Sequence, residues 1–280
     1  MKNALLAAAL LATSAFAHPS VSVVRDKQGN VYYSDLERVW RVAPDGVKTV
    51  AVPGVHSHEL CVDAEGNLYG EHLWYEGEKV DKWGHYVWRL APDGTLTKVI
   101  PAREGFLKDY SFVRDARGTM YWGDRGKVTV LRKKGADGRV LEVASAELRD
   151  LRWMTATADG TLFLIDDGDL VRVGKDGALK RLTADLGESG ALQFFVGKRH
   201  RVMGLWPDPA GNVYVAVPGT RKVKRVAPDG SVSVVTTSRY PWTPTGGMLD
   251  PGGDLWILEW GPTNSARLRR IRREGKETIY

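Results

Sequence analysis

The chain has 280 residues, a net charge of +6 at neutral pH and a single cysteine, Cys61. A lone cysteine excludes internal disulfides, so packing must stabilise the fold. The length would fit two ordinary domains, but the chain is built of repeats that need neighbours to bury both faces of each sheet, which favours one domain.

The first 17 residues have the pattern of a secretory signal. One positive charge, Lys2, precedes an apolar run from Ala4 to Ala12, and Ala15-Phe16-Ala17 forms a small-x-small cleavage site. The run is too short for a transmembrane helix. We therefore expect a signal peptide at residues 1–17 and a mature, secreted or periplasmic chain that begins at His18 and has no transmembrane segment.

A ten-residue pattern then recurs six times, as DKQGNVYYSD from Asp26, DAEGNLYGEH from Asp63, DARGTMYWGD from Asp115, TADGTLFLID from Thr157, DPAGNVYVAV from Asp208 and DPGGDLWILE from Asp250. The glycines of these repeats are 37 to 52 residues apart. This period predicts an all-β, six-bladed β-propeller over residues 18–280. The first strand begins a complete first blade and the last strand can complete the last blade. The ring should therefore close with little or no strand exchange, by packing of the first blade against the last.

The second repeat shows how one blade is built. Leu60-Cys61-Val62 leads into a glycine turn, and Leu68-Tyr69-Gly70 returns as the next strand. Val87 to Leu90 forms a third strand, which a Pro-Asp-Gly turn connects to a fourth strand from Thr97 to Ile100. Each repeat is therefore predicted to be a four-stranded antiparallel blade, with Cys61 buried in an inner strand.

Two further columns recur too regularly to be catalytic. An aromatic residue follows each glycine by three positions, and every third strand carries an arginine. These residues are Tyr32, Tyr69, Tyr121, Phe163, Tyr214 and Trp256, and Arg41, Arg89, Arg132, Arg172, Arg225 and Arg270. We interpret the aromatic residues as packing between blades and the arginines as polar partners of neighbouring blades.

The repeats D-x-x-G-N-V/L-Y and R-V-x-P-D-G resemble those of NHL-repeat propellers and of the senescence-marker/gluconolactonase superfamily, over essentially all of residues 18–280. This resemblance implies the propeller fold and leaves the activity open, because such propellers include metal-dependent lactonases, lyases and binding platforms. In the gluconolactonase-like families, Glu, Asn and Asp at the start of inner strands hold a divalent metal. Here those positions carry Val21, His58, Tyr110, Arg152, Met203 and Thr245, so that ligand set is absent.

Streptogramin-lyase-type propellers offer a closer resemblance at the rim. Their repeats place His at the start of the inner strand and Glu at the end of the second strand, and His58 and Glu259 match these positions. The second position otherwise carries Asp35, His72, Asp124, Asp166 and Val217. We expect Asp35, Asp124, Asp166 and Glu259 to gather at one channel opening with His58 and His72. The catalytic candidates are His58, His72 and Glu259.

Four of the six histidines lie between His56 and His85. Alternation puts His56 and His58 on one face of a strand, and antiparallel pairing brings His72 beside His58. Imidazole and carboxylate are ligands of zinc, copper and nickel, so a divalent metal is a candidate cofactor. The candidate ligands are His56, His58, Glu71, His72, Asp124 and Asp166, and the alternative is that these polar groups fill the channel mouth through hydrogen bonds.

The second blade also has the longest predicted loop, from Leu73 to Tyr86. Trp74, Tyr75 and Trp83 lie among charges there and suit a sugar, a ring or a peptide, unless the loop folds over its own blade. Other ligand-binding candidates at the rim are Tyr110, Arg152, Trp153, His200, Trp242 and Trp260, with Asp109 beside them.

Three further observations complete the interpretation. The run Arg267 to Arg273 is expected to be partly exposed. We do not expect it to bind nucleic acid, because the protein is predicted to be exported and no base-stacking motif accompanies the arginines. Cleavage after Ala17 would give His18 a free amine and imidazole, which resembles the copper brace of lytic polysaccharide monooxygenases. The chain has no nucleophile elbow, phosphate loop or dinucleotide fingerprint.

The sequence thus favours a monomeric propeller that binds a small molecule or glycan at its channel mouth, with metal-assisted hydrolase or lyase chemistry as its activity. The alternative is a non-catalytic module that binds a protein or polymer through its rim loops.

Overall fold

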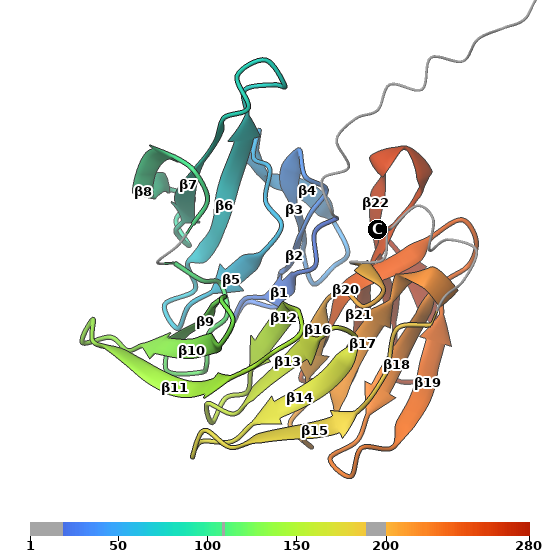
Figure 1. Ribbon diagram of the computed structural model, residues 1–280. Helices are drawn as coiled ribbons and strands as arrows, with labels where there is room; N and C mark the ends of the chain where they lie inside the picture. The colour runs from blue at the N-terminus through green and yellow to red at the C-terminus, as the bar shows by residue number, and fades with distance from the viewer. Residues whose placement is uncertain (1–18, 108–109, 189–199) are drawn as a thin grey trace, which may run out of the picture.

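The computed structural model describes residues 19–107, 110–188 and 200–280. Its regular structure is nearly all β, arranged as six antiparallel sheets around a centre where β1, β5, β12, β16 and β20 meet (Figure 1). The prediction of a six-bladed propeller is confirmed. Two short 3-10 turns, η2 (Pro218–Thr220) and η3 (Pro262–Asn264), follow the second strands of the last two blades. No helix in these residues is long and apolar enough to cross a membrane.

The strands follow one another in chain order within every blade. The first blade contains β1 (Val23–Arg25), β2 (Val31–Ser34), β3 (Arg38–Val42) and β4 (Lys48–Pro53). The second contains β5 (Leu60–Val62), β6 (Leu68–Tyr75), β7 (Trp83–Leu90) and β8 (Leu96–Glu104). The third contains β9 (Met120–Asp124), β10 (Thr129–Lys134) and β11 (Val140–Ala146).

The second half of the chain repeats the same order. The fourth blade contains β12 (Leu151–Ala156), β13 (Leu162–Asp166), β14 (Asp169–Val173) and β15 (Leu179–Thr183). The fifth contains β16 (Leu205–Pro207), β17 (Val213–Val217), β18 (Lys222–Val226) and β19 (Val232–Thr237). The sixth contains β20 (Thr243–Leu249), β21 (Leu255–Trp260), β22 (Ala266–Ile271) and β23 (Glu277–Ile279).

The third blade departs from four regular strands. Its innermost segment contributes a single bridge, between Arg114 and Met120, in place of a strand. The side chain of Ser111 accepts a hydrogen bond from the Val113 backbone N–H at 3.1 Å. Local bonds of this kind compete with strand pairing.

The turn of each repeat explains both the glycine and the aromatic column. Gly66 has a φ of +87°, a conformation that glycine adopts without strain. In the same turn, Asp63 accepts hydrogen bonds from the Asn67 backbone at 2.8 Å and from the Tyr69 hydroxyl at 2.9 Å. The aromatic residues therefore also bind the aspartate of their own turn. Tyr32, Tyr121 and Trp256 make the same bond.

Two of the six repeated arginines pair within their own blade, whereas the sequence predicted pairing with a neighbouring blade. Arg132 pairs with Asp124 of its own blade, and Arg270 pairs with Asp254, also within one blade, at 2.6 Å. The run Arg267 to Arg273 is likewise largely neutralised. Arg269, only 3% exposed, pairs with Glu259 and Glu277. In the strand register, Arg132 lies opposite Trp122 and Arg270 opposite Trp256, so both ion pairs are made with acidic residues elsewhere in the same blade.

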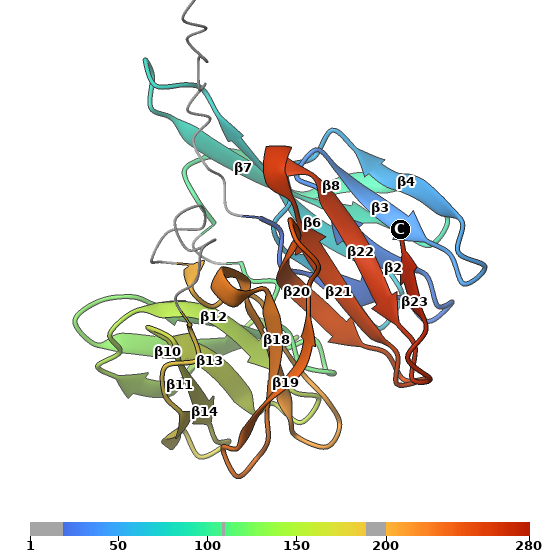
Figure 2. The ribbon, with the colours of Figure 1, turned by 90° about the vertical axis from the view of Figure 1, so that its right-hand side faces the viewer.

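The ring closes between its first and last blades without strand exchange, as predicted. No sheet of the described chain mixes strands from the two ends. Instead, Val23 and Tyr33 of the first blade pack against Leu258 and Leu268 of the last, and the two blades lie side by side in Figure 2. At the channel, Thr245 donates a hydrogen bond to the Ser20 carbonyl at 2.8 Å.

One junction of the ring differs from the others. Five apolar clusters each join two neighbouring blades. The sixth packs Cys61 and Val87 of the second blade against Phe112 of the connecting segment, rather than against a strand of the third blade. The junction between the second and third blades is therefore formed by a connection, and a cavity opens beside it.

Candidate functional site

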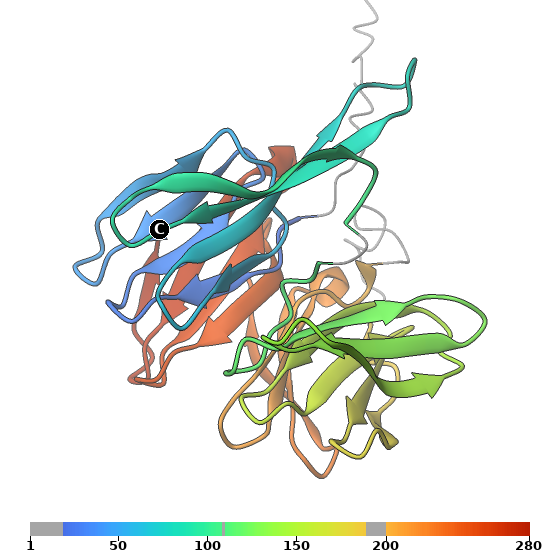
Figure 3. The same cartoon turned by 90° about the vertical axis from the view of Figure 1, so that its left-hand side faces the viewer.

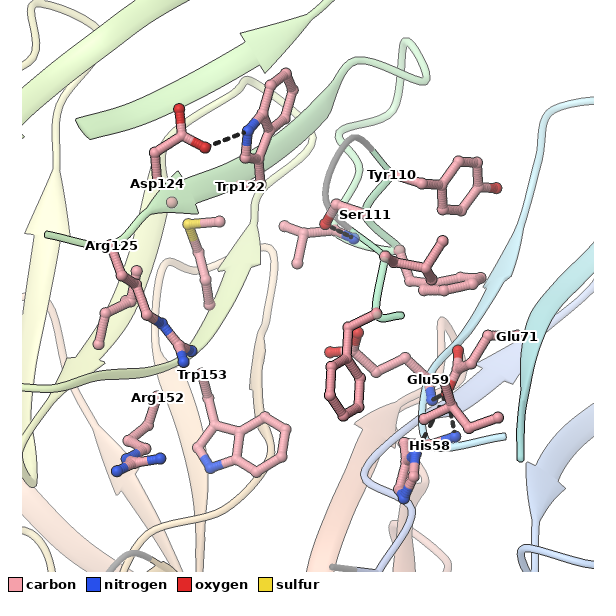
Figure 4. Close-up of a pocket in the computed structure, with 18 of the residues that line it drawn as sticks. His58, Glu59, Glu71, Tyr110, Ser111, Trp122, Asp124, Arg125, Arg152 and Trp153 are labelled. Atoms are coloured by element: carbon pink, nitrogen blue, oxygen red, sulfur yellow. Dashed lines mark hydrogen bonds and ion pairs between the residues drawn. The ribbon is translucent and has the colours of Figure 1, made fainter. Parts of the chain in front are cut away.

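A cavity of about 790 Å³ lies between the second, third and fourth blades. Blade residues form opposite walls, and residues 106–107 and 110–113 of the connection contribute to the lining (Figure 4). Cavities of this size accommodate small-molecule ligands. The cavity is therefore the candidate functional site.

The buried carboxylate of Glu71 organises one wall. Residues 69, 71, 73 and 75 of β6 alternate onto the face that is turned toward the cavity. Glu71 is only 4% exposed, and its Oε1 accepts a hydrogen bond from the His58 backbone N–H at 2.6 Å. The Glu59 backbone N–H lies 3.4 Å from the same oxygen, and His58 Nδ1 lies 3.5 Å from it. Glu71 thus fixes both residues that precede β5.

The other carboxylate oxygen of Glu71, Oε2, is buried and has no hydrogen-bond partner among the described residues. A buried acceptor of this kind is uncommon in proteins and requires an explanation. Since Glu71 lines the cavity, a donor group of a ligand would satisfy this oxygen.

Glu59 is the second carboxyl group of this wall. Burial, followed by the negative charge of Glu71, raises the pKa of Glu59 to about 7. A group with such a pKa is present in both protonation states at neutral pH, so it can donate or accept a proton in a reaction. Two carboxyl groups whose environments differ in this way are typical of acid–base sites.

Arginine side chains lie on the opposite wall (Figure 4). Arg125 is exposed and makes no ion pair with the described residues, whereas Arg152 is bound by Asp150 with an Nε–Oδ2 distance of 2.7 Å. Asp124 is occupied by Arg132 and by Trp122 Nε1. Arg125 is therefore the group with capacity to bind an anionic ligand.

The histidine cluster is arranged differently from the prediction. The rings of His56 and His58 meet edge to face with centroids 4.8 Å apart. His72 lies on the opposite face of β6 from Glu71, where its Nδ1 accepts the His56 backbone N–H at 3.0 Å and its ring stacks on Tyr86. A one-residue step in a strand reverses the face, which is why His72 does not join His58.

These contacts leave the proposed metal ligands apart. Within the described ranges, no three His, Cys, Asp or Glu side chains are placed so that they could hold a metal ion. Burial, together with the charge of His58, lowers the pKa of His56 to about 4, so it is neutral at physiological pH. A neutral imidazole could bind a metal, so it is the placement of the described side chains, not their charge, that does not match the metal site suggested by the sequence.

The four acidic residues at the ends of the second strands, Asp35, Asp124, Asp166 and Glu259, are each bound by nearby side chains, and their gathering at one opening stays a prediction. Asp35 accepts Trp40 Nε1 at 2.7 Å, and Asp166 lies 3.6 Å from Arg149. Glu259 is completely buried between Arg267 and Arg269, at 2.7 and 2.8 Å. These three carboxylates thus have hydrogen-bond or ion-pair partners close to their own strands. Asp124 is the one that lines the cavity.

The aromatic segment Leu73 to Tyr86 is a hairpin rather than a loop. β6 and β7 remain paired up to Tyr75 and Trp83, and the hairpin rises beyond the neighbouring blades (Figure 3). Trp74 lies over Gly84 on the face opposite to Tyr75 and Trp83, so the three aromatic residues do not form one surface. In a strand, successive side chains point to opposite faces, whereas an irregular loop would have allowed all three rings to share one face.

The remaining ligand-binding candidates divide into two groups. Tyr110, Arg152, Trp153 and His200 line the cavity, and their part in binding stays a prediction. Trp242 lies under the guanidinium of Arg267, and Trp260 is buried, both in the sixth blade. His18 and Asp109 lie outside the described residues.

Sequence reasoning missed Glu59 and Arg125 as site residues. Glu59 adjoins His58 and lies opposite residue 71 once the strands are paired, so the pairing of β5 with β6 could have identified it. Arg125 directly follows Asp124 at the end of a second strand, and no other blade has an arginine at this position. Trp122 and Ser111 also line the cavity, and we find no sequence signal that singles them out.

Comparison with known proteins supports the fold. No family model and no curated protein matches the chain. Virginiamycin B lyase from Staphylococcus aureus is 13% identical, with a TM-score of 0.50 over 92% of this chain and 82% of its own. A gluconolactonase from Xanthomonas campestris is 15% identical, with a TM-score of 0.57 over 85% and 83%. A luciferin-regenerating enzyme is 13% identical, with a TM-score of 0.59 over 92% of each chain. The chain shares the propeller fold of these gluconolactonase- and lyase-like proteins.

Proposed function

We propose that this protein binds a small polar molecule or glycan in the cavity and transfers protons there as a hydrolase or lyase. The observation that carries the proposal is the pair of Glu59 and Glu71, one with a pKa of about 7 and the other with a buried oxygen that lacks a partner, on one cavity wall. The similar propellers include enzymes, which supports a catalytic interpretation by analogy of fold alone.

Each residue of the wall has a distinct role in this proposal. Glu59 donates or accepts the proton. Glu71 holds the backbone of His58 and Glu59 and contacts the ligand through Oε2. Arg125 attracts a negatively charged group of the ligand, such as a carboxylate, on the other side of the cavity. Because the donor groups do not form a metal site, no step of this reaction is assigned to a metal.

The test is a turnover screen with lactones, esters and uronides, with and without chelator. Wild-type protein is compared with Glu59→Gln, Glu71→Gln and the control Glu65→Gln, an exposed residue in a turn of the same blade. We expect Glu59→Gln to lower kcat by 10²- to 10⁴-fold, as loss of a general acid or base does, with unchanged activity in the control. Equal activity of Glu59→Gln and wild-type protein on a processed substrate would contradict the proposal.

The non-catalytic alternative has one structural observation in its favour. The β6–β7 hairpin carries half-buried aromatic residues that do not line the cavity, where they suit binding rather than chemistry. Ligand binding by calorimetry without turnover of any bound compound would favour a binding module.

We further propose that residues 1–17 direct export and that the mature protein is a monomer. N-terminal sequencing of protein recovered from the periplasm or medium, and light scattering of the purified protein, test these two points. The copper hypothesis for His18 is tested by titration of copper into mature protein and its His18→Ala variant.

A further inference from the structure

Tyr75, Trp83 and Phe106 form an aromatic strip on the cavity side of the second blade. The rings of Tyr75 and Trp83 stack with centroids 4.4 Å apart, and Phe106 lies 5.4 Å from Trp83. Phe106 is 56% exposed, so much of its ring is accessible to a ligand.

Backbone pairing fixes the position of this aromatic strip. Tyr75 is the register partner of Trp83, and the pairing of β7 with β8 continues to Gly84 and Glu104. The Gly105 backbone N–H then donates to the Trp83 carbonyl at 2.6 Å, and His85 Nδ1 lies 2.6 Å from the Gly105 carbonyl oxygen. The segment that carries Phe106 is therefore tied to β7, so the strip is ordered before any ligand arrives.

The aromatic strip is continuous with the cavity. Glu71, Leu73 and Tyr75 follow one another on the same face of β6, and the first two line the cavity, as does Phe106. Tyr75 lies four residue steps beyond Glu71 along the extended strand, which corresponds to about 13 Å. A ligand that contacts both Glu71 and the strip must be longer than a single sugar ring or lactone.

The charged side chains near the aromatic strip do not favour a strongly charged binding partner. The turn beyond it carries Glu76, Glu78, Lys79, Asp81 and Lys82, a nearly balanced set. Such a surface attracts neither a polycation nor an anionic membrane strongly. Aromatic faces beside carboxyl and guanidinium groups instead match a molecule with apolar ring faces and polar edges.

We infer that the aromatic strip is an additional subsite for an oligosaccharide whose terminal unit occupies the cavity. This inference rests on the proposed function for the cavity and names the ligand class of the same site. Sugar rings pack their C–H faces on Tyr75, Trp83 and Phe106, while the hydroxyl groups of the terminal unit bind Glu59 and Glu71. An acidic terminal unit also meets Arg125.

The test is binding to an array of neutral and uronic-acid-containing glycans of one to six units. We expect retention of glycans of three or more units and at least tenfold weaker binding of the monosaccharides. Trp83→Ala and Phe106→Ala should each weaken binding of the longer glycans about tenfold, whereas Trp83→Phe should retain most of it. Tyr240→Ala, a 76% exposed residue between β19 and β20, is the control, and thermal unfolding shows whether each variant is folded.

Two results would overturn the inference. One is an array on which no glycan is retained, and the other is glycan binding that folded Trp83→Ala and Phe106→Ala variants leave unchanged. Failure of the cavity proposal is distinguished by Glu59→Gln and Glu71→Gln. If these variants keep full turnover while binding still depends on glycan length and on Trp83, the acid–base proposal fails and the aromatic subsite stands.

Discussion

Replacement of Glu59 by glutamine should stabilise the protein at alkaline pH. The pKa of Glu59 is about 7 in the folded protein, against 4.5 for an unperturbed glutamate. At about 1.4 kcal/mol per pKa unit, ionisation of this side chain costs the folded state on the order of 3 kcal/mol. Glutamine has nearly the same shape and carries no charge, so Glu59→Gln should remove this cost.

The pH dependence follows from the direction of the pKa shift. Below pH 4.5 the carboxyl is protonated in both states, so wild-type and variant differ only by neutral contacts. Between pH 4.5 and 7 the unfolded chain ionises while the folded protein does not, and the wild-type protein loses stability progressively. Above pH 7 the difference should level off, with Glu59→Gln more stable by up to about 3 kcal/mol.

Urea unfolding between pH 4 and 8.5, followed by tryptophan fluorescence, measures this difference. Glu65→Gln, on an exposed turn of the same blade, is the matched control and should follow the wild-type curve. A stability difference between wild-type and Glu59→Gln that does not change with pH would refute the reasoning, as would a more stable wild-type protein at pH 8. Stability lost to a charged group in a cavity is the usual trade-off of a functional site.

Three further predictions concern the framework. Arg269→Met should destabilise the protein by about 3–5 kcal/mol in urea unfolding, because it removes a buried partner of Glu259. Leu164→Ala, in a fully buried position between the third and fourth blades, should cost about 2–5 kcal/mol by the same measurement. Gly246→Ala should lower the melting temperature in calorimetry, since its Cβ would lie 1.8 Å from the Val21 carbonyl oxygen where the first and last blades meet. An unchanged melting temperature would show that the ring does not close there.

The fold could be predicted because its determinants are local and repeated. A turn such as Asp63 to Asn67 requires its glycine and aspartate, so the same letters appear in every blade. The strand that is missing from the third blade was not visible in this way. The inner segment there forms only the Arg114–Met120 bridge, although the repeat turn that follows it is regular.

The site was harder to predict because it depends on which face each side chain occupies. His72 and Glu71 are neighbours in sequence, yet one stacks on Tyr86 while the other lines the cavity. The burial that raises the pKa of Glu59 likewise depends on tertiary packing, which the repeated pattern does not encode. Similarly, nothing local indicates that Glu259 is neutralised by two arginines.

The hairpin of β6 and β7 also determines how easily this protein can change during evolution. Added residues lengthen a hairpin at its tip, and two more per strand extend it by about 7 Å while every existing side chain keeps its face. Tyr75 and Trp83 would then still lie on the cavity side, and Trp74 would still pack over Gly84. Descendants could thus acquire a longer or shorter reach by insertions or deletions at the tip, without altering the packing of the ring or the carboxyl groups of the cavity.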